Sequence, residues 1–206
     1  TAVNNMLKAN PPPLMHRRNT RHIQTGNLDD DLSLLAECDL VIEAVIEDLE
    51  IKQDLYRRVD TARKPGSIVT SNTSTIPLAK LVSGLPEGFA RDFAITHVFN
   101  PPRYLRLLEV VAGTHTRADA ITSLQVFGDR TLGKSVVQCK DTPGFIANRI
   151  GILWTTSAIR FAFEDQLSVE EADAIVGRPM GIPKTGVFGL MDLVGIDLQP
   201  HVSASM

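Results

Sequence analysis

The sequence predicts an α/β fold, in which a doubly wound parallel sheet is followed by an all-helical segment. Two observations lead to this prediction. Short apolar runs alternate with helical patterns over roughly the first two thirds of the 206 residues, which is typical of parallel strands joined by helices. From residue 142 onward the pattern is helical, with glycine and proline between the pieces. We therefore expect a sheet domain over residues 1–141 and a helical domain over residues 142–206.

The sheet domain begins with a polar segment broken by three consecutive prolines, where we expect only a short extended piece at 21–25. Four apolar runs then predict strands at 39–45, 67–70, 93–97 and 107–111. Helical spacing predicts helices at 51–62 and 76–82, and a further helix from a capping box at Thr116 to Gly133. This order of elements predicts parallel strands with functional loops at their carboxyl ends.

The helical domain has two predicted starts. Thr142 is a good cap and Pro143 suits the first position of a long helix. Ser168 begins a second capping box, and Gly177 is placed to end the helix that follows.

Composition excludes several function classes. A hydrophobic content of 43% and a net charge of −3 are those of an ordinary globular protein, and they favour neither nucleic acid nor an anionic membrane as a partner. No apolar run is long enough to span a bilayer. Cys38 and Cys139 lie far apart, which indicates neither a disulfide framework nor a metal site. We expect a reducing, cytoplasmic location.

Three polar residues lie in or just after predicted strands. Ser74 follows the strand at 67–70, His97 ends the strand at 93–97, and Glu109 lies inside the apolar run 107–111. Ser74 has a second interpretation as the cap of a helix that starts at Ile76, a role that Thr75 could also fill.

Glu109 is the residue that favours a paired site. A carboxylate buried in an apolar strand is costly without a partner. If its strand neighbours that of His97, the carboxylate reaches the far imidazole nitrogen and fixes the tautomer. A histidine held in this way, beside the hydroxyl of Ser74, can deprotonate an alcohol. We therefore predict one site made of Ser74, His97 and Glu109.

Four further residues have alternative interpretations. The amide of Asn148, one turn inside the predicted long helix, either meets a substrate oxygen or faces water. Glu47 and Lys52 flank the start of a helix, and they form either an exposed ion pair or contacts to a cofactor's ribose and nicotinamide. Asn100, between Phe99 and Pro101, is also typical of a turn.

These motifs resemble those of the L-3-hydroxyacyl-CoA dehydrogenase family. The resemblance runs from about Asp39 to the C-terminus, and three motifs occur in the family's order and at its approximate separations. They are Ser71-Asn72-Thr73-Ser74, His97-x-Phe99-Asn100-Pro101 and Asp141-Thr142-Pro143-Gly144-Phe145-x-x-Asn148-Arg149.

The resemblance implies a Rossmann-type domain followed by a helical domain that carries a homodimer contact. It implies that NAD accepts a hydride as an L-3-hydroxyacyl-CoA is oxidised to the 3-ketoacyl-CoA in fatty-acid β-oxidation. On this resemblance His97 takes the hydroxyl proton, Glu109 orients His97 and stabilises the imidazolium, Ser74 contacts substrate and cofactor, and Asn148 supports the reacting oxygen. The positions that match cofactor contacts of the family are Glu47, Lys52, Ser74 and Asn100.

One departure from the family is the absence of any Gly-x-Gly-x-x-Gly sequence, so the predicted Rossmann-type sheet is incomplete. We expect the chain to be a fragment of a longer enzyme that, by itself, binds NAD poorly and turns over slowly or not at all. Two alternatives are a dehydrogenase of a small hydroxy acid or sugar acid, and a non-catalytic structural relative of the lens-crystallin kind. The presence of both His97 and Glu109 argues against the non-catalytic alternative.

Overall fold

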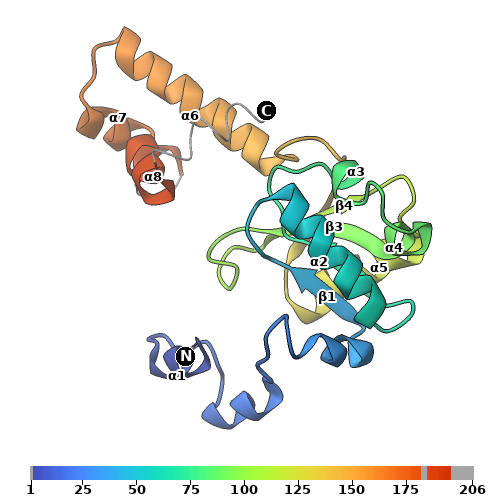
Figure 1. The fold of residues 1–206 in the computed structure, drawn as a ribbon. Coiled ribbons are helices and arrows are strands. Elements are labelled where there is room, and N and C mark those ends of the chain that lie inside the picture. Colours follow the sequence, from blue (N-terminus) through green and yellow to red (C-terminus); the bar gives the residue numbers. More distant parts are fainter. Residues whose placement is uncertain (1, 182–184, 196–206) are drawn as a thin grey trace.

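The computed structural model describes residues 2–181 and 185–195. A sheet with helices packed against it forms the main body, and the helices α6, α7 and α8 form an arm beside it (Figure 1). The five strands are β1 (Leu40–Glu43), β2 (Ile68–Ser71), β3 (Phe93–Val98), β4 (Leu107–Ala112) and β5 (Ser135–Cys139).

Helices connect the strands and make up the arm. The helices of the N-terminal segment are α1 (Ala2–Lys8), η1 (Arg17–His22) and η2 (Leu32–Glu37). The helices of the body are α2 (Leu49–Ala62), α3 (Leu78–Leu81), α4 (Glu87–Asp92), α5 (Ala118–Val126) and the π-helical turn η3 (Phe127–Thr131). The helices of the arm are α6 (Ala147–Glu164), α7 (Val169–Ile175), the short η4 (Arg178–Met180) and α8 (Gly186–Val194).

The predicted α/β class is confirmed, but the sheet is not wholly parallel. Its strands follow the order β1-β2-β3-β4-β5, and β1, β2 and β3 are parallel. Strand β4 pairs antiparallel with β3, and β5 is parallel to β4. The physical reason is the short turn between β3 and β4, which holds no helix, whereas a parallel crossover needs about a dozen residues or more. The sequence prediction of parallel strands throughout was therefore wrong at β4.

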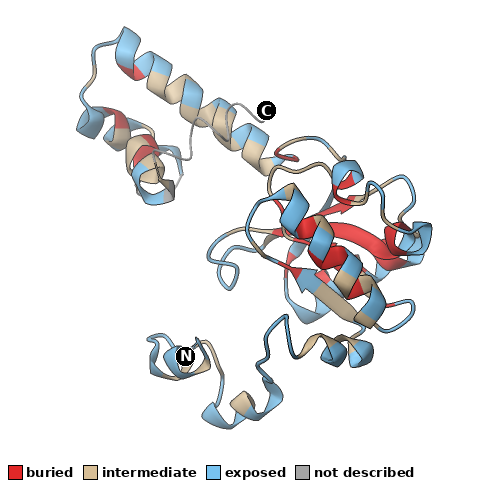
Figure 2. Cartoon of the chain, viewed as in Figure 1, coloured by how far each residue is buried: buried red, intermediate tan, exposed pale blue. Residues whose placement is uncertain are grey.

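The two faces of the sheet have separate cores, because successive side chains of a strand point to opposite faces. On one face Phe93 and Ile95 of β3 pack with side chains of α2, α3 and α4. On the other face Ala94 packs with Ile121 and Leu124 of α5. Figure 2 shows this buried centre as a red band through the sheet. By the same alternation His97 points to the face that α2 and α3 cover. It therefore lies near the turn at residues 72–77 that carries Ser74, called the serine turn below.

Several predicted boundaries needed correction. The segment predicted as extended at 21–25 begins inside η1, and strand β5 and helix α4 were not predicted. Thr116 caps no helix, because its hydroxyl donates to the Phe93 carbonyl oxygen at 2.7 Å. The long helix starts at Ala147 instead of next to Thr142, since Gly144 and Phe145 adopt positive φ angles that are incompatible with a helix. The capping box at Ser168 is confirmed.

Among the described helices, none combines the length and the apolar character that a bilayer crossing requires.

Candidate active site at the carboxyl edge of the sheet

His97 and Glu109 form the centre of the site. They are register partners across the antiparallel β3–β4 pair, and His97 Nδ1 lies 2.8 Å from Glu109 Oε2. Both side chains are buried, with only 5% and 1% of their surface exposed. The contact that the sequence predicted between these two residues is therefore present.

The second oxygen of Glu109 holds the start of the helical arm. Glu109 Oε1 accepts hydrogen bonds from the backbone N–H groups of Ile146 at 3.0 Å and Ala147 at 2.8 Å. Burial raises the pKa of Glu109, but the hydrogen bonds from His97 and from these two N–H groups outweigh burial and keep the pKa below its ordinary value. Glu109 is therefore ionised, and it takes the role at the start of α6 that the sequence had suggested for Thr142.

The charge state of Glu109 fixes the tautomer of His97. An ionised carboxylate only accepts hydrogen bonds, so His97 Nδ1 must carry the hydrogen between them. In the neutral imidazole, Nε2 is then an acceptor. His97 Nε2 lies 3.0 Å from Ser74 Oγ, so the serine hydroxyl donates to it. The ring is also flanked by Phe99 and Phe145, whose centroids lie 4.5 and 5.5 Å from its own.

Glu47 holds the turn that carries Ser74. Its Oε1 accepts from the N–H groups of Ser74 at 3.1 Å and Thr75 at 3.2 Å, and from the hydroxyl groups of Thr75 and Thr73. Ser74 does not cap a helix, because α3 begins at Leu78 and is capped by another residue. Burial raises the pKa of Glu47, and the contacts to Thr73 and the nearby Lys52 bring it below its ordinary value.

Lys52 lies beneath Glu47 and is enclosed by protein. Its side chain is 1% exposed, and Nζ lies 2.7 Å from Glu43 Oε1 and 3.3 Å from Glu47 Oε2. It also donates to the Val45 carbonyl oxygen at 3.3 Å. The ammonium group therefore faces carboxylates instead of solvent, and its predicted contact with a cofactor stays a prediction.

Glu43, at the end of β1, is a functional candidate that sequence reasoning missed. Glu43 Oε2 accepts from the Tyr56 hydroxyl at 2.6 Å and from Ser71 Oγ at 2.7 Å. Burial raises the pKa of Glu43, yet the contacts to Lys52, Tyr56, Ser71 and Val45 keep it below its ordinary value. The sequence did contain the relevant clue, since Glu43 is a carboxylate inside an apolar run, as Glu109 is.

The two predicted asparagines both follow His97 in the chain. Asn148 is half-buried in the first turn of α6, beside the N–H groups that Glu109 binds. Asn100 is exposed just after β3. A third asparagine, Asn72, was not predicted as a site residue. Its Oδ1 accepts from the Val98 N–H at 3.0 Å and so ties the start of the serine turn to the end of β3.

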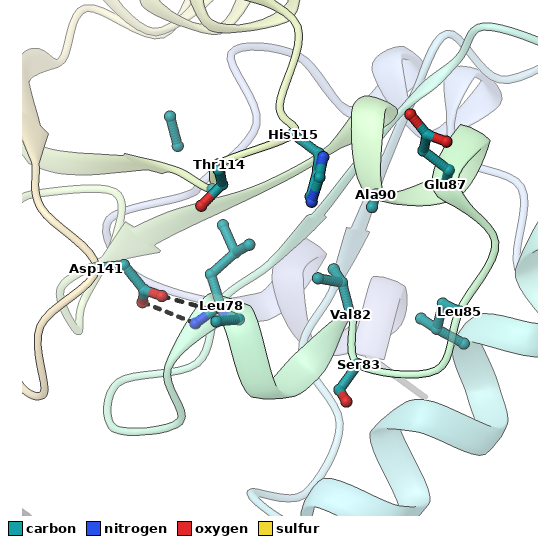
Figure 3. Close-up of a pocket in the computed structure, with 12 residues that line it drawn as sticks. Leu78, Val82, Ser83, Leu85, Glu87, Ala90, Thr114, His115 and Asp141 are labelled. Carbon is teal, nitrogen blue, oxygen red and sulfur yellow. Dashed lines mark hydrogen bonds between the residues drawn. The ribbon is translucent and has the colours of Figure 1, made fainter.

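A separate cavity of about 540 Å³ lies beside α3 and does not include His97 or Ser74 in its lining. Figure 3 shows its wall, where Asp141 points at the start of α3. The Asp141 carboxylate accepts from the N–H groups of Leu78 at 2.7 Å and Ala79 at 3.1 Å. Asp141, in the segment between the two predicted domains, is therefore hydrogen-bonded to the start of α3, the helix that follows the serine turn.

No group of three or more histidine, cysteine, aspartate or glutamate side chains in residues 2–181 and 185–195 is arranged to hold a metal ion.

Comparison with known proteins gives matches over both predicted domains. A family model described as "3-hydroxyacyl-CoA dehydrogenase, NAD binding domain" matches residues 4–142, and one described as "3-hydroxyacyl-CoA dehydrogenase, C-terminal domain" matches residues 144–206. The chain is similar to the crystal structure of FadB2 from M. tuberculosis, with a TM-score of 0.86 and 30% identity over 100% of this chain and 70% of that one.

Two curated relatives share more of the sequence. Each is named "Probable 3-hydroxyacyl-CoA dehydrogenase": one of Bacillus subtilis is 42% identical over 100% of the chain, and one of Deinococcus radiodurans is 39% identical over 99% of it. The chain spans 26% of the length of the first relative and 59% of the second.

Proposed function

The chain belongs to the 3-hydroxyacyl-CoA dehydrogenase family, and from this premise we propose that its protein oxidises L-3-hydroxyacyl-CoA to 3-ketoacyl-CoA in fatty-acid oxidation. The cofactor is NAD, as the description of the family model over residues 4–142 gives it. The observation that carries the proposal is the contact of His97 with both Ser74 and the ionised Glu109. This contact leaves a histidine nitrogen able to accept a proton from an alcohol.

The proton leaves the substrate for a residue of this chain. His97 Nε2 accepts the proton of the substrate's 3-hydroxyl group, and the bound NAD would supply the hydride acceptor for the carbon that carries this hydroxyl. Glu109 stabilises the imidazolium that results, because its carboxylate is ionised and 2.8 Å from Nδ1. The substrate hydroxyl replaces Ser74 Oγ as the donor to Nε2, so that Ser74 can hydrogen-bond the reacting oxygen, and Asn148 supports that oxygen from the first turn of α6.

The position of the site fits a dinucleotide. Strands β1, β2 and β3 are parallel and their carboxyl ends lie on one edge, where cofactors bind in open α/β sheets. Glu47 is the part of the Glu43–Lys52–Glu47 group that reaches this edge, with 39% of its side chain exposed. We propose that Glu47, Ser74 and Asn100 face the cofactor there. Lys52 contributes from its buried position through its contact with Glu47.

Substrate class is tested by comparing acyl-CoA with free hydroxy acids. The complete polypeptide that carries this chain should form NADH from L-3-hydroxybutyryl-CoA and, at equal concentration, hardly at all from free 3-hydroxybutyrate or a sugar acid. A preference for the free acids would instead support a small-molecule dehydrogenase. Absence of turnover with every substrate would favour a non-catalytic relative.

We further propose a homodimer through the helical arm and a division of the chain at residues 141 and 142. Ile150, Leu153 and Phe161 share one face of α6 and are at least half exposed, which supports a partner surface. The two family models adjoin at residues 142 and 144, which supports the division. The free thiols of Cys38 and Cys139 support a reducing compartment such as the cytoplasm.

A further inference from the structure

We propose that Glu47 is a positioning residue for Ser74, and that the buried Lys52–Glu43 pair holds Glu47 in place. The inference rests on the proposed function, because it gives the group a task within that site. It assigns Glu47 a role inside the protein in addition to the cofactor contact that the sequence suggests. It also assigns a role to Glu43.

The serine turn is held by Glu47. Residues 72–77 lie between β2 and α3 and belong to no helix or strand. A single oxygen, Glu47 Oε1, accepts from both backbone N–H groups of Ser74 and Thr75 and from the hydroxyls of Thr73 and Thr75. These contacts come from residues that lie 26 to 28 positions along the chain from Glu47. Without them the N–H groups of the turn would have to find other partners, and Ser74 would lose its fixed position.

Glu47 is itself held by Lys52. Its other oxygen, Oε2, lies 3.3 Å from Lys52 Nζ. Lys52 cannot turn outward without leaving Glu43 unpaired, because its ammonium lies 2.7 Å from Glu43 Oε1 in a buried setting. Removing one member of such a pair leaves the other as a buried charge, which is strongly unfavourable. Glu43 is in turn fixed by Tyr56 and Ser71.

The serine turn contacts the proton-accepting histidine through Ser74. Ser74 Oγ lies 3.0 Å from His97 Nε2, the nitrogen that takes the substrate proton. A small displacement of a group that positions the reacting atoms lowers the rate of the chemical step more than it lowers affinity. Removing a residue that only contacts the cofactor, by contrast, mainly raises the KM for NAD. The two roles of Glu47 therefore differ in the kinetic constant that they affect.

The variants follow from this difference. Glu47→Ala should lower kcat by about 10- to 100-fold at saturating NAD, because the turn loses its acceptor. Glu47→Gln keeps an amide oxygen that can accept from the turn but places its NH₂ group beside the Lys52 ammonium, so its kcat should fall below wild type but less than that of Glu47→Ala. Glu50→Ala is the matched control, because Glu50 is an exposed glutamate in the first turn of the neighbouring α2.

A double-mutant cycle tests whether Glu47 acts through Ser74. The kcat of Glu47→Ala/Ser74→Ala should equal that of Ser74→Ala alone within about twofold, since the turn has nothing left to position. Losses that multiply would overturn the proposal. So would a Glu47→Ala variant that raises the KM for NAD while its kcat stays at the wild-type value.

A measurement without turnover separates this inference from the proposed function. In protein labelled with ¹⁵N-histidine, the Nε2 shift of His97, assigned by its loss in His97→Gln, reports the hydrogen bond from Ser74. Glu47→Ala should move this shift to the value of Ser74→Ala, while Glu50→Ala should leave it unchanged. An unmoved shift in Glu47→Ala would overturn the positioning role even if the wild type oxidises 3-hydroxyacyl-CoA. A moved shift would support the role even if that activity were absent.

Discussion

Glu109 and His97 face each other across the antiparallel β3–β4 pair, with 2.8 Å between Glu109 Oε2 and His97 Nδ1. The same carboxylate binds the first N–H groups of α6 through its other oxygen. One side chain therefore orients the histidine and anchors the helical arm. This double use makes the ionised state of Glu109 important for both the chemistry and the folded structure.

Glu109→Gln should lower kcat by roughly 10²–10⁴-fold, which is the usual contribution of general acid–base catalysis. The amide oxygen can still accept from Ile146 and Ala147, so the protein should fold. The amide NH₂ group then donates to His97 Nδ1, which places the imidazole hydrogen on Nε2 and removes the acceptor. The check is kcat for acetoacetyl-CoA reduction, with circular dichroism to confirm folding. A kcat close to wild type would contradict the assigned tautomer.

Tyr56→Phe should lower the free energy of unfolding by about 1–3 kcal/mol, because the buried Glu43 carboxylate loses a hydrogen-bond donor while the ring stays in place. The Tyr56 hydroxyl lies 2.6 Å from Glu43 Oε2 and the side chain is fully buried. Tyr104→Phe is the matched control, since Tyr104 is 58% exposed and should change stability by less than about 0.5 kcal/mol. Urea unfolding of both variants decides the point, and equal midpoints would argue against a stabilising contact.

The free energy of unfolding should fall as the pH drops below about 4.5, the ordinary pKa of a glutamate. The pKa of Glu109 is lowered in the folded state, so its contribution is fully present above the unfolded-state pKa and is lost as pH falls through the folded-state value. Glu109→Gln lacks this group and should lose less stability over the same acid interval. Denaturant titrations at several pH values test this, and parallel curves for the two proteins would show that Glu109 is not linked to folding.

Leu153→Ser should shift the protein from dimer to monomer in light scattering, because it places a hydroxyl in the proposed contact face of α6. Leu153 is 69% exposed on the face that it shares with Ile150 and Phe161. Phe163→Ser is the control, as Phe163 is 76% exposed but lies about 130° around the helix from the centre of that face. If both variants keep the wild-type mass, the partner surface lies elsewhere.

The pairing of His97 with Glu109 could be predicted from sequence because one rule applied: a carboxylate in an apolar strand needs a partner. The same rule applied to Glu43, but its partners Lys52 and Tyr56 lie in α2. The helical spacing of the apolar residues from Ile51 to Ala62 had predicted that other positions of this helix are buried. Ile51 is in fact 49% exposed, and the buried positions of α2 are Lys52 and Tyr56 together with the predicted Leu55 and Val59. A buried lysine cannot be recognised from hydrophobic periodicity, since that pattern counts it as polar.

The fold was predictable to a similar degree. Alternation of strands and helices predicted the α/β class, but the direction of β4 depends on the length of the turn before it, not on any pattern inside the strand. Strand β5 is mostly exposed or half-buried along its length, so it has no continuous apolar run. The start of α6 depends on a tertiary contact with Glu109, which no local cap residue reveals.

The proton-transfer role of His97 is tested by the rate of acetoacetyl-CoA reduction by NADH in the complete polypeptide, measured for wild type and His97→Gln at equal NADH binding. Wild type should turn over, and the variant should lose roughly 10²-fold or more in kcat, because it lacks the imidazole nitrogen that Glu109 orients toward Ser74. A variant that keeps the wild-type kcat would contradict the assignment of His97 as the group that exchanges a proton with the substrate.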